Sequence, residues 1–318
     1  LDAGAWQHPR GWMHGLAHGE IREDATEMDL IQAFKGPDTI YPDGINTELG
    51  LKQLESLAGK ESDKPFFLAF GILRPHLPFG APQKYLDLYK DAELPVIPHP
   101  NKPSGRTTWH NSGEFYKYNR NNLDPNTNAE YSLTVRKHYA ACVSFADAQV
   151  GRILDRLDEL NLRENTIVVL WGDHGWHLGE HSIWGKHALF EESLRSPLII
   201  SYPGIPNPGQ LSHSMVETID IFPTLAELAG LPKPKHSDGV SLRPILDSPT
   251  ATGHDAFAYF SKGYGRTIRT ETHRMIAHDD GFIELYDHRT LAGETSNVAD
   301  EQPEVVRTLL AKIEARFE

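Results

Sequence analysis

The longest regular pattern of apolar positions lies between residues 129 and 160. Apolar side chains recur there at steps of three and four residues, at Tyr139, Cys142, Val143, Ala146, Val150, Ile153, Leu154 and Leu157. Steps of this size place side chains on one face of an α-helix. The pattern therefore predicts a long helix that packs one face against a core.

Two continuous apolar runs predict buried strands. Residues 166–171 (TIVVLW) are rich in β-branched side chains, and residues 64–71 (KPFFLAFG) hold aromatic side chains between a Pro and a Gly. Strands that a parallel sheet buries on both faces have such runs. Residues 196–202 predict the strand that follows TIVVLW. The order of helix, turn, strand and polar loop predicts an α/β domain whose ligands bind beyond the carboxyl ends of its strands.

The segments between these runs are less regular. Residues 1–44 and 95–127 are rich in Gly, Pro and polar side chains without sustained periodicity, which predicts loops. Shorter apolar patterns with capping residues predict further helices at about 46–59, 83–89 and 220–230.

The apolar runs become shorter near the C-terminus. Four short apolar runs are broken by Gly or charged turns, at 256–261, 266–270, 274–278 and 282–286. They predict a small antiparallel sheet, and residues 303–317 predict one helix that covers it. We expect an α/β domain over residues 1–250, with a mostly parallel sheet flanked by helices, and a small subdomain over 251–318.

Composition narrows the class of protein. The 318 residues include 31 Lys and Arg against 44 Asp and Glu, a net charge of −13, which disfavours binding to nucleic acid. Apolar runs stay well below the roughly 20 residues of a membrane-spanning helix. One cysteine, Cys142, excludes an intrachain disulfide. The first residues, LDAG, contain no signal peptide, so we expect any targeting segment to lie outside this chain.

Candidate chemistry follows the strand predicted at 166–171. Asp173 and His174 offer an oxygen and an imidazole nitrogen to a divalent cation, and the glycines on both sides allow a tight turn. Lys186, thirteen residues beyond Asp173, could hold an anion beside that cation. Taken alone, the pattern is equally typical of a turn with a satisfied histidine, and two ligands do not fill a coordination sphere.

Three longer stretches resemble one known family. They are LWGDHGWHLGEHSIWGKH (170–187), KPFFLAFGILRPHLPF (64–79) and ELYDHRTLAGETSNVA (284–299). They resemble the D-H-G-W-x-L-G-E-H…W-x-K, P-H-x-P-F and E-L-Y-D…E-x-x-N signatures of the type I, formylglycine-dependent sulfatases, in the iduronate-2-sulfatase-like branch. Leu291 and Ala292 depart from the usual acidic residue and proline. The resemblance runs from about residue 36 to the end, in the order of the family.

The resemblance implies a fold and a set of roles. The fold would be the alkaline-phosphatase-like sulfatase fold. Asp173 and His174 would be ligands of one Ca²⁺ ion, and Lys186 and His76 would be catalytic residues that contact the sulfate oxygens. His76 could also protonate the leaving alkoxide.

Other residues on these loops are candidates for substrate binding, namely Arg74, Trp176, His177 and His181. Each has an alternative interpretation. Trp176 could stack on a sugar ring or pack the loop. The spacing of the histidines after His174 suggests a zinc cluster, but H-E-x-x-H and cysteine pairs are absent, so structural imidazoles are favoured.

The nucleophile of the family is missing from the sequence. Type I sulfatases form it from Cys or Ser in C/S-x-P-x-R, and Cys142 lies in AACVSFA on the apolar face of the predicted helix, where a core thiol is expected. Also missing are the paired aspartates that complete the metal site and a G-K-x-x-H stretch. We therefore expect the C-terminal two-thirds of a sulfatase, inactive alone, whose absent N-terminal part carries the formylglycine.

The expected activity is hydrolysis of a sulfuric ester on a sulfated sugar or polysaccharide, without a nucleic-acid partner or a membrane span. By family, the location would be periplasmic or secreted. Two alternatives stay open. One is a phosphodiesterase or phosphonate hydrolase of the same superfamily, and the other is a truncated, non-catalytic relative.

Overall fold

The computed structural model describes residues 15–17, 20–22, 29–59, 64–259 and 265–317. The chain forms two compact units. Unit 1 contains residues 1–97 and 112–163, and unit 2 contains residues 98–111 and 164–318. The boundary predicted at residue 250 therefore lies inside unit 2.

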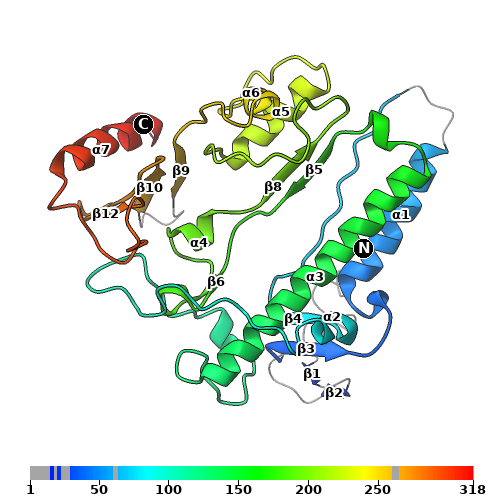
Figure 1. The fold of residues 1–318 in the computed structure, drawn as a ribbon, viewed down its shortest axis with the longest axis horizontal. Coiled ribbons are helices and arrows are strands. Elements are labelled where there is room, and N and C mark those ends of the chain that lie inside the picture. Colours follow the sequence, from blue (N-terminus) through cyan, green and yellow to red (C-terminus); the bar gives the residue numbers. More distant parts are fainter. Residues whose placement is uncertain (1–14, 18–19, 23–28, 60–63, 260–264, 318) are drawn as a thin grey trace. The chain divides into compact units, whose positions relative to one another are not determined.

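Unit 1 is built around the predicted long helix, α3 (Ala129–Glu159). Asn128 caps it by accepting the N–H of Tyr131 at 2.9 Å. The helix α1 (Pro42–Ala58) lies beside it (Figure 1). The remaining described elements of this unit are the strands β1 (Gly15–Ala17), β2 (Glu20–Arg22), β3 (Ile31–Phe34) and β4 (Phe79–Pro82), the helix α2 (Gln83–Asp87), and the 3-10 turns η2 (Asp38–Ile40) and η3 (Phe115–Lys117).

Two predictions for unit 1 are wrong. Residues 64–71 form no strand, and the Phe67 side chain is 84% exposed. No described strand pairs with this segment, and a strand without a neighbour leaves its backbone polar groups unsatisfied. The loop predicted over 1–44 contains β3, which pairs in parallel with β4, and the start of α1.

Unit 2 contains the strand β5 (Val168–Trp171) and the strand β8 (Leu198–Ser201), both predicted. They pair antiparallel rather than parallel, with Leu170 opposite Ile199. The physical reason is that the chain between them returns at the same end of β5, where the Gly172 N–H donates to Pro197 O at 3.0 Å. A parallel pair needs a connection that crosses back over the length of the strand.

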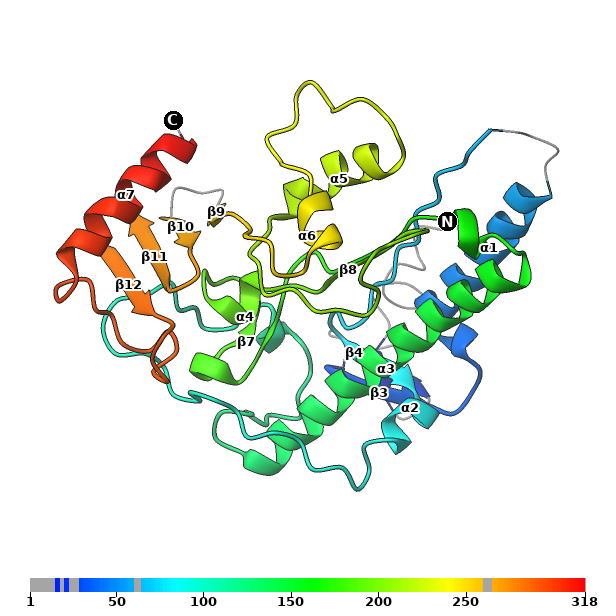
Figure 2. The same ribbon diagram turned by 45° about the horizontal axis from the view of Figure 1, so that its top comes forward.

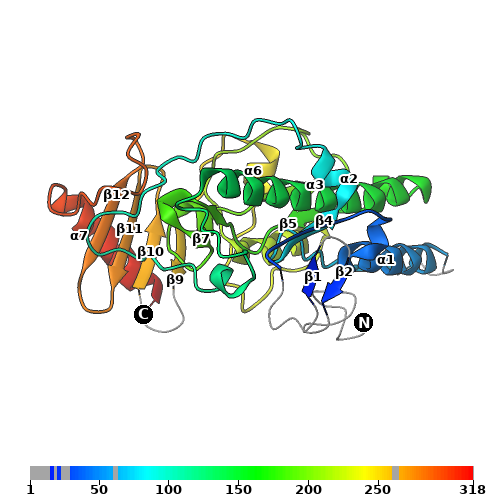
Figure 3. The same ribbon diagram turned by 90° about the horizontal axis from the view of Figure 1, so that it is seen from below.

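The C-terminal prediction is confirmed. The strands β9 (Ala256–Tyr259), β10 (Gly265–Arg269), β11 (His273–His278) and β12 (Ile283–Asp287) form one antiparallel sheet in the order β12-β11-β10-β9 (Figure 3). Residues 260 and 261 of the first predicted run lie outside the described residues. The helix α7 (Pro303–Phe317) covers the sheet (Figure 2), and together they bury Ile268, Met275, Leu285, Leu309 and Ile313.

The other elements of unit 2 are short. They are η4 (Arg163–Asn165, at its boundary), β6 (His177–Leu178), η5 (Glu180–Ser182), β7 (Trp184–Gly185), α4 (Glu191–Leu194), η6 (Thr218–Asp220), α5 (Ile221–Leu228) and α6 (Arg243–Asp247). Within the described part of the chain, no helix has both the length and the apolar character that crossing a bilayer requires.

Candidate functional site

Asp173 and His174 lie directly beyond β5, as predicted, and their side chains face each other. The ring Nδ1 of His174 lies 2.7 Å from the backbone oxygen of Gly175. Because a carbonyl oxygen only accepts, Nδ1 carries the proton and Nε2 presents its lone pair. That Nε2 lies 3.7 Å from Oδ2 of Asp173, whose side chain is 78% exposed. An oxygen and a nitrogen of the kinds that bind divalent cations thus lie close together in this loop.

The backbone of this loop is held at both ends by the segment before β8. The Gly172 N–H donates to Pro197 O at 3.0 Å, and the Gly175 N–H donates to Ser193 O at 2.8 Å. A Cβ atom at Gly175 would lie only 2.0 Å from the backbone oxygen of Glu192. Glycine is therefore required by close packing against α4, and α4 fixes where the loop runs.

Lys186 reaches the same loop through a small hairpin. The strands β6 and β7 pair His177 with Gly185, and this register places Lys186 across from Trp176. The ammonium Nζ of Lys186 lies 5.6 Å from the centre of the Trp176 ring, a cation–π contact. The thirteen-residue spacing in the sequence thus corresponds to a chain reversal that brings the lysine back beside the D-H-G-W segment.

His177 and His181 lie in the interior. Their side chains are 0% and 1% exposed, and His181 stacks on Phe190 with ring centres 4.5 Å apart. Each faces Oε2 of Glu192, at 3.9 Å from His177 Nδ1 and 3.6 Å from His181 Nε2. Burial lowers the pKa of His177 to about 4, although Glu192 opposes the shift. This placement favours a structural role for both rings over direct contact with a substrate.

In unit 1, Arg74 braces the loop that carries His76. Its side chain is 5% exposed, and it donates from Nε to Gly80 O at 2.6 Å and from NH1 to His76 O at 3.2 Å. The ring Nδ1 of His76 lies 2.8 Å from Leu77 O, and Nε2 lies 3.7 Å from Oε1 of Glu114. Because Leu77 O only accepts, Nδ1 of His76 carries a proton, and Nε2 faces Glu114. Arg74 therefore holds the backbone of the loop that carries His76 in place.

Cys142 is a buried thiol on α3, as the sequence predicted. Its side chain is 0% exposed, and burial raises the pKa of the thiol to about 12. A thiol needs its ionised form to act as a nucleophile. Cys142 therefore supplies no reactive group.

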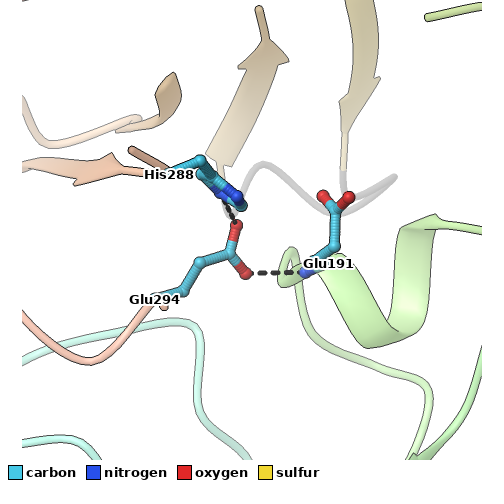
Figure 4. Close-up of side chains that lie close together, drawn as sticks. All are labelled: Glu191, His288 and Glu294. Atoms are coloured by element: carbon cyan, nitrogen blue, oxygen red, sulfur yellow. Dashed lines mark hydrogen bonds and ion pairs between the residues drawn. The ribbon is translucent and has the colours of Figure 1, made fainter. Parts of the chain in front are cut away.

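Sequence reasoning missed a charged cluster on unit 2. Ligand atoms of Glu191, His288 and Glu294 lie within 4.8 Å of one another (Figure 4). Glu294 belongs to the E-x-x-N part of the third signature, which was the available signal, whereas nothing local marked Glu191 or His288. The cluster lies between α4 and the loop after β12, with Glu294 buried and with Glu191 and His288 part-buried.

Solved structures share the fold of this chain. A phosphonate monoester hydrolase from Silicibacter pomeroyi superposes with a TM-score of 0.74 at 25% identity, covering 88% of this chain and 60% of that one. A protein solved with its substrate D-glucosamine-2-N,6-O-disulfate superposes with a TM-score of 0.72 at 22% identity, covering 87% and 69%. The fold is that of the alkaline-phosphatase-like hydrolases.

Matches to family models identify the protein family within this fold. The sulfatase model matches residues 12–231, and the model of the N-sulphoglucosamine sulphohydrolase C-terminal region matches residues 179–318. The chain belongs to the sulfatase family.

Curated relatives agree with this assignment. A sulfatase of Formosa agariphila is 32% identical over 90% of this chain and 56% of its own length. Human iduronate 2-sulfatase (Homo sapiens) is 33% identical over 62% of this chain and 42% of its own length. The chain thus spans about half the length of the curated relatives that it matches.

Proposed function

We propose that the complete protein hydrolyses a sulfuric ester on a sulfated sugar. The observation that carries the proposal is the facing pair of Asp173 Oδ2 and His174 Nε2, set by the carbonyl of Gly175, within a sulfatase-family chain. Relatives named as iduronate 2-sulfatase, and the structure solved with a disulfated glucosamine, support a carbohydrate substrate. By family, we propose a periplasmic or secreted location.

Each candidate residue has a defined task in this proposal. Asp173 and His174 would hold a divalent cation, which we take to be Ca²⁺ because the resemblance to the type I sulfatases implies it. When bound, the cation offsets negative charge on the sulfate. Lys186 would bind the sulfate oxygens, and His76, when both ring nitrogens carry a proton, would donate the one on Nε2 to the leaving alkoxide. Trp176 would contribute a face for the sugar ring.

The nucleophile would come from outside these 318 residues. The sequence contains no C/S-x-P-x-R motif, and the lone thiol, Cys142, is buried with a raised pKa. We propose that the formylglycine lies in a part of the complete protein beyond this chain. On that basis the 318-residue chain alone has no sulfatase turnover.

The test replaces Asp173 in the complete protein. Asp173→Asn removes the charged ligand, and we expect kcat for an aryl sulfate to fall about 10²- to 10³-fold, as for loss of one group that stabilises charge in the transition state. Asp279→Asn, which changes an exposed carboxylate of unit 2, serves as the matched control and should leave kcat unchanged. Full activity of Asp173→Asn would refute the assignment of the site.

A second candidate activity is hydrolysis of phosphonate esters. The observation in its favour is the similarity to the Silicibacter pomeroyi enzyme, at 25% identity with a TM-score of 0.74. Comparing kcat/KM for matched aryl sulfate and aryl phosphonate substrates separates the two. A large preference for the phosphonate would overturn the sulfatase proposal and support this alternative.

A further inference from the structure

Glu294 lies at the centre of a charged network that joins the C-terminal sheet to α4. One of its carboxylate oxygens, Oε2, accepts the backbone N–H of Glu191 at 2.6 Å, and the other, Oε1, accepts from His288 Nε2 at 3.0 Å (Figure 4). The Nε of Arg274 donates to Oε1 as well. Arg274 also donates from NH2 to Oε2 of Glu191 at 2.5 Å, and Arg269 donates to the same oxygen at 3.2 Å.

This network is already neutral without a metal ion. The guanidinium groups of Arg269 and Arg274 balance the carboxylates of Glu191 and Glu294. The ring of His288 is satisfied on both sides, since Nδ1 accepts from Arg269 NH2 at 3.1 Å and Nε2 donates to Glu294. The cluster is therefore better described as a set of ion pairs than as a cation site.

The two central residues of the network, Arg274 and Glu294, are buried. Arg274 is 2% exposed and Glu294 is 3% exposed. Burial by itself raises the pKa of Glu294, but Arg274, His288 and the Glu191 N–H lower it to about 2, so this carboxylate is ionised at neutral pH. A buried ion pair tolerates the loss of one partner poorly, because the other charge is then left uncompensated.

The helix that Glu294 holds is the one that fixes the Asp173–His174 loop. Glu191 is the first residue of α4. Two residues later, Ser193 O accepts the Gly175 N–H at 2.8 Å, and the Gly175 backbone touches Glu192 O closely enough to exclude a Cβ atom. Gly175 in turn accepts from the ring of His174 and so sets its tautomer.

We propose that Glu294 is a positioning residue for the candidate site. It anchors the first turn of α4, and α4 anchors the loop through the hydrogen bond between Ser193 O and Gly175. Glu294, in the signature at residues 284–299, thereby helps to fix the position of the loop in the signature at residues 170–187. This inference rests on the proposed function for the roles of Asp173 and His174, whereas the mechanical link itself does not.

The first test measures amide hydrogen exchange in the 318-residue chain. Glu294→Gln keeps the size of the side chain but replaces charge-assisted hydrogen bonds with neutral ones. We expect exchange at the Gly175 amide to accelerate about tenfold relative to amides of β11 in the same sample. Unchanged relative exchange at Gly175 would overturn the proposal.

Asp220→Asn is the matched control. Asp220 is a fully buried carboxylate of unit 2 that accepts the N–H groups of Glu217 and Val240 and faces His254, none of which belongs to α4. It should destabilise unit 2 without selective acceleration at Gly175. Equal acceleration by both variants would show a general loss of stability and would also overturn the proposal.

A double variant keeps the test informative if Glu294→Gln folds poorly. Arg274→Met with Glu294→Met replaces the buried pair by apolar side chains, which commonly preserves stability. It also removes the acceptor of the Glu191 N–H, so rapid exchange at Gly175 should persist in a stable protein. Restored wild-type exchange in this variant would contradict the anchoring role.

In the complete protein, Glu294→Gln should weaken Ca²⁺ binding measured by calorimetry about 10- to 100-fold, the range for residues that orient metal ligands. Asp220→Asn should leave Ca²⁺ binding unchanged.

If the wild-type protein hydrolyses no sulfate ester while Gly175 exchange responds to Glu294→Gln, the proposed function fails and the positioning role stands. If Ca²⁺ binds equally to both proteins and exchange is unchanged, the positioning role fails alone.

Discussion

Individual histidines of one loop lie in different surroundings. His174 is part-exposed and faces Asp173, with its tautomer set by the carbonyl of Gly175. His177 and His181, only a few residues further on, are fully buried and face Glu192. The three residues look alike in the sequence. They differ in their access to solvent. The chain reverses at the β6–β7 hairpin, and His177 and His181 lie in this buried hairpin, whereas His174 lies before it.

The cysteine provides a prediction at this scale. Because Cys142 is buried and its pKa is raised to about 12, it should not react with a thiol reagent in the folded protein at pH 8. One equivalent should react after unfolding in denaturant. Cys142→Ala should leave the activity of the complete protein unchanged, and rapid labelling of the folded chain would contradict the buried placement.

At the scale of elements, short polar contacts join helices and strands that periodicity alone leaves unconnected. His254, just before β9, lies 2.7 Å from Asp220 Oδ2 and 3.8 Å from Glu217 Oε2, at the start of α5. Its Nδ1 lies 2.8 Å from Asp255 O. Burial lowers the pKa of His254, but the Asp255 carbonyl and the two carboxylates raise it more, so the net shift is upward.

This shift predicts a pH-dependent contribution to stability. A group whose pKa is raised on folding stabilises the folded state fully below its unfolded pKa, about 6.5, and loses that contribution as pH rises through its folded pKa. The difference in unfolding free energy between wild type and His254→Gln should therefore be larger at pH 5.5 than at pH 9. Urea unfolding at both pH values measures it.

A matched control isolates this histidine. His236 is exposed on a loop of the same unit, so His236→Gln should change the unfolding free energy little at either pH. A loss in His254→Gln that grows with pH, opposite to the expected sign, would contradict the assigned contacts.

At the scale of the whole molecule, each unit exposes large apolar side chains. In unit 2, Leu170 and Ile199 lie opposite each other on the β5–β8 pair and are 37% and 58% exposed. In unit 1, Phe67 is 84% exposed in a segment whose sequence is typical of a buried strand. Exposed apolar strands with free edges favour association between chains.

The 318-residue chain should therefore self-associate and bind a hydrophobic dye. Replacing both Leu170 and Ile199 by Thr should lower dye fluorescence and light scattering at equal concentration. Val96→Thr is the control, because Val96 is 90% exposed in a loop without a strand edge. Equal effects of the control and the double variant would refute a role for the β5–β8 surface.

The helices α1, α2, α3, α5 and α7, the strands β5, β8 and β9 to β12, and the position of the Asp173–His174 loop beyond β5 follow from the sequence by itself. They depend on local periodicity, on caps such as Asn128, and on spacing within one stretch, all of which a linear pattern records. The three signatures likewise placed the chain in its family. The failed strand at 64–71 shows the limit of this reasoning, since an apolar run becomes a strand only where a neighbour completes its hydrogen bonds.

Only the tertiary structure decided the partner of each element and the burial of each polar side chain. The hydrogen bond from the Glu191 N–H to Glu294 joins residues 103 positions apart, and the β5–β8 pairing is antiparallel although both strands read as parallel ones. No local pattern encodes such contacts, because they depend on how the chain returns in space. The physical reason is that burial and charge pairing arise only when segments distant in the sequence pack together.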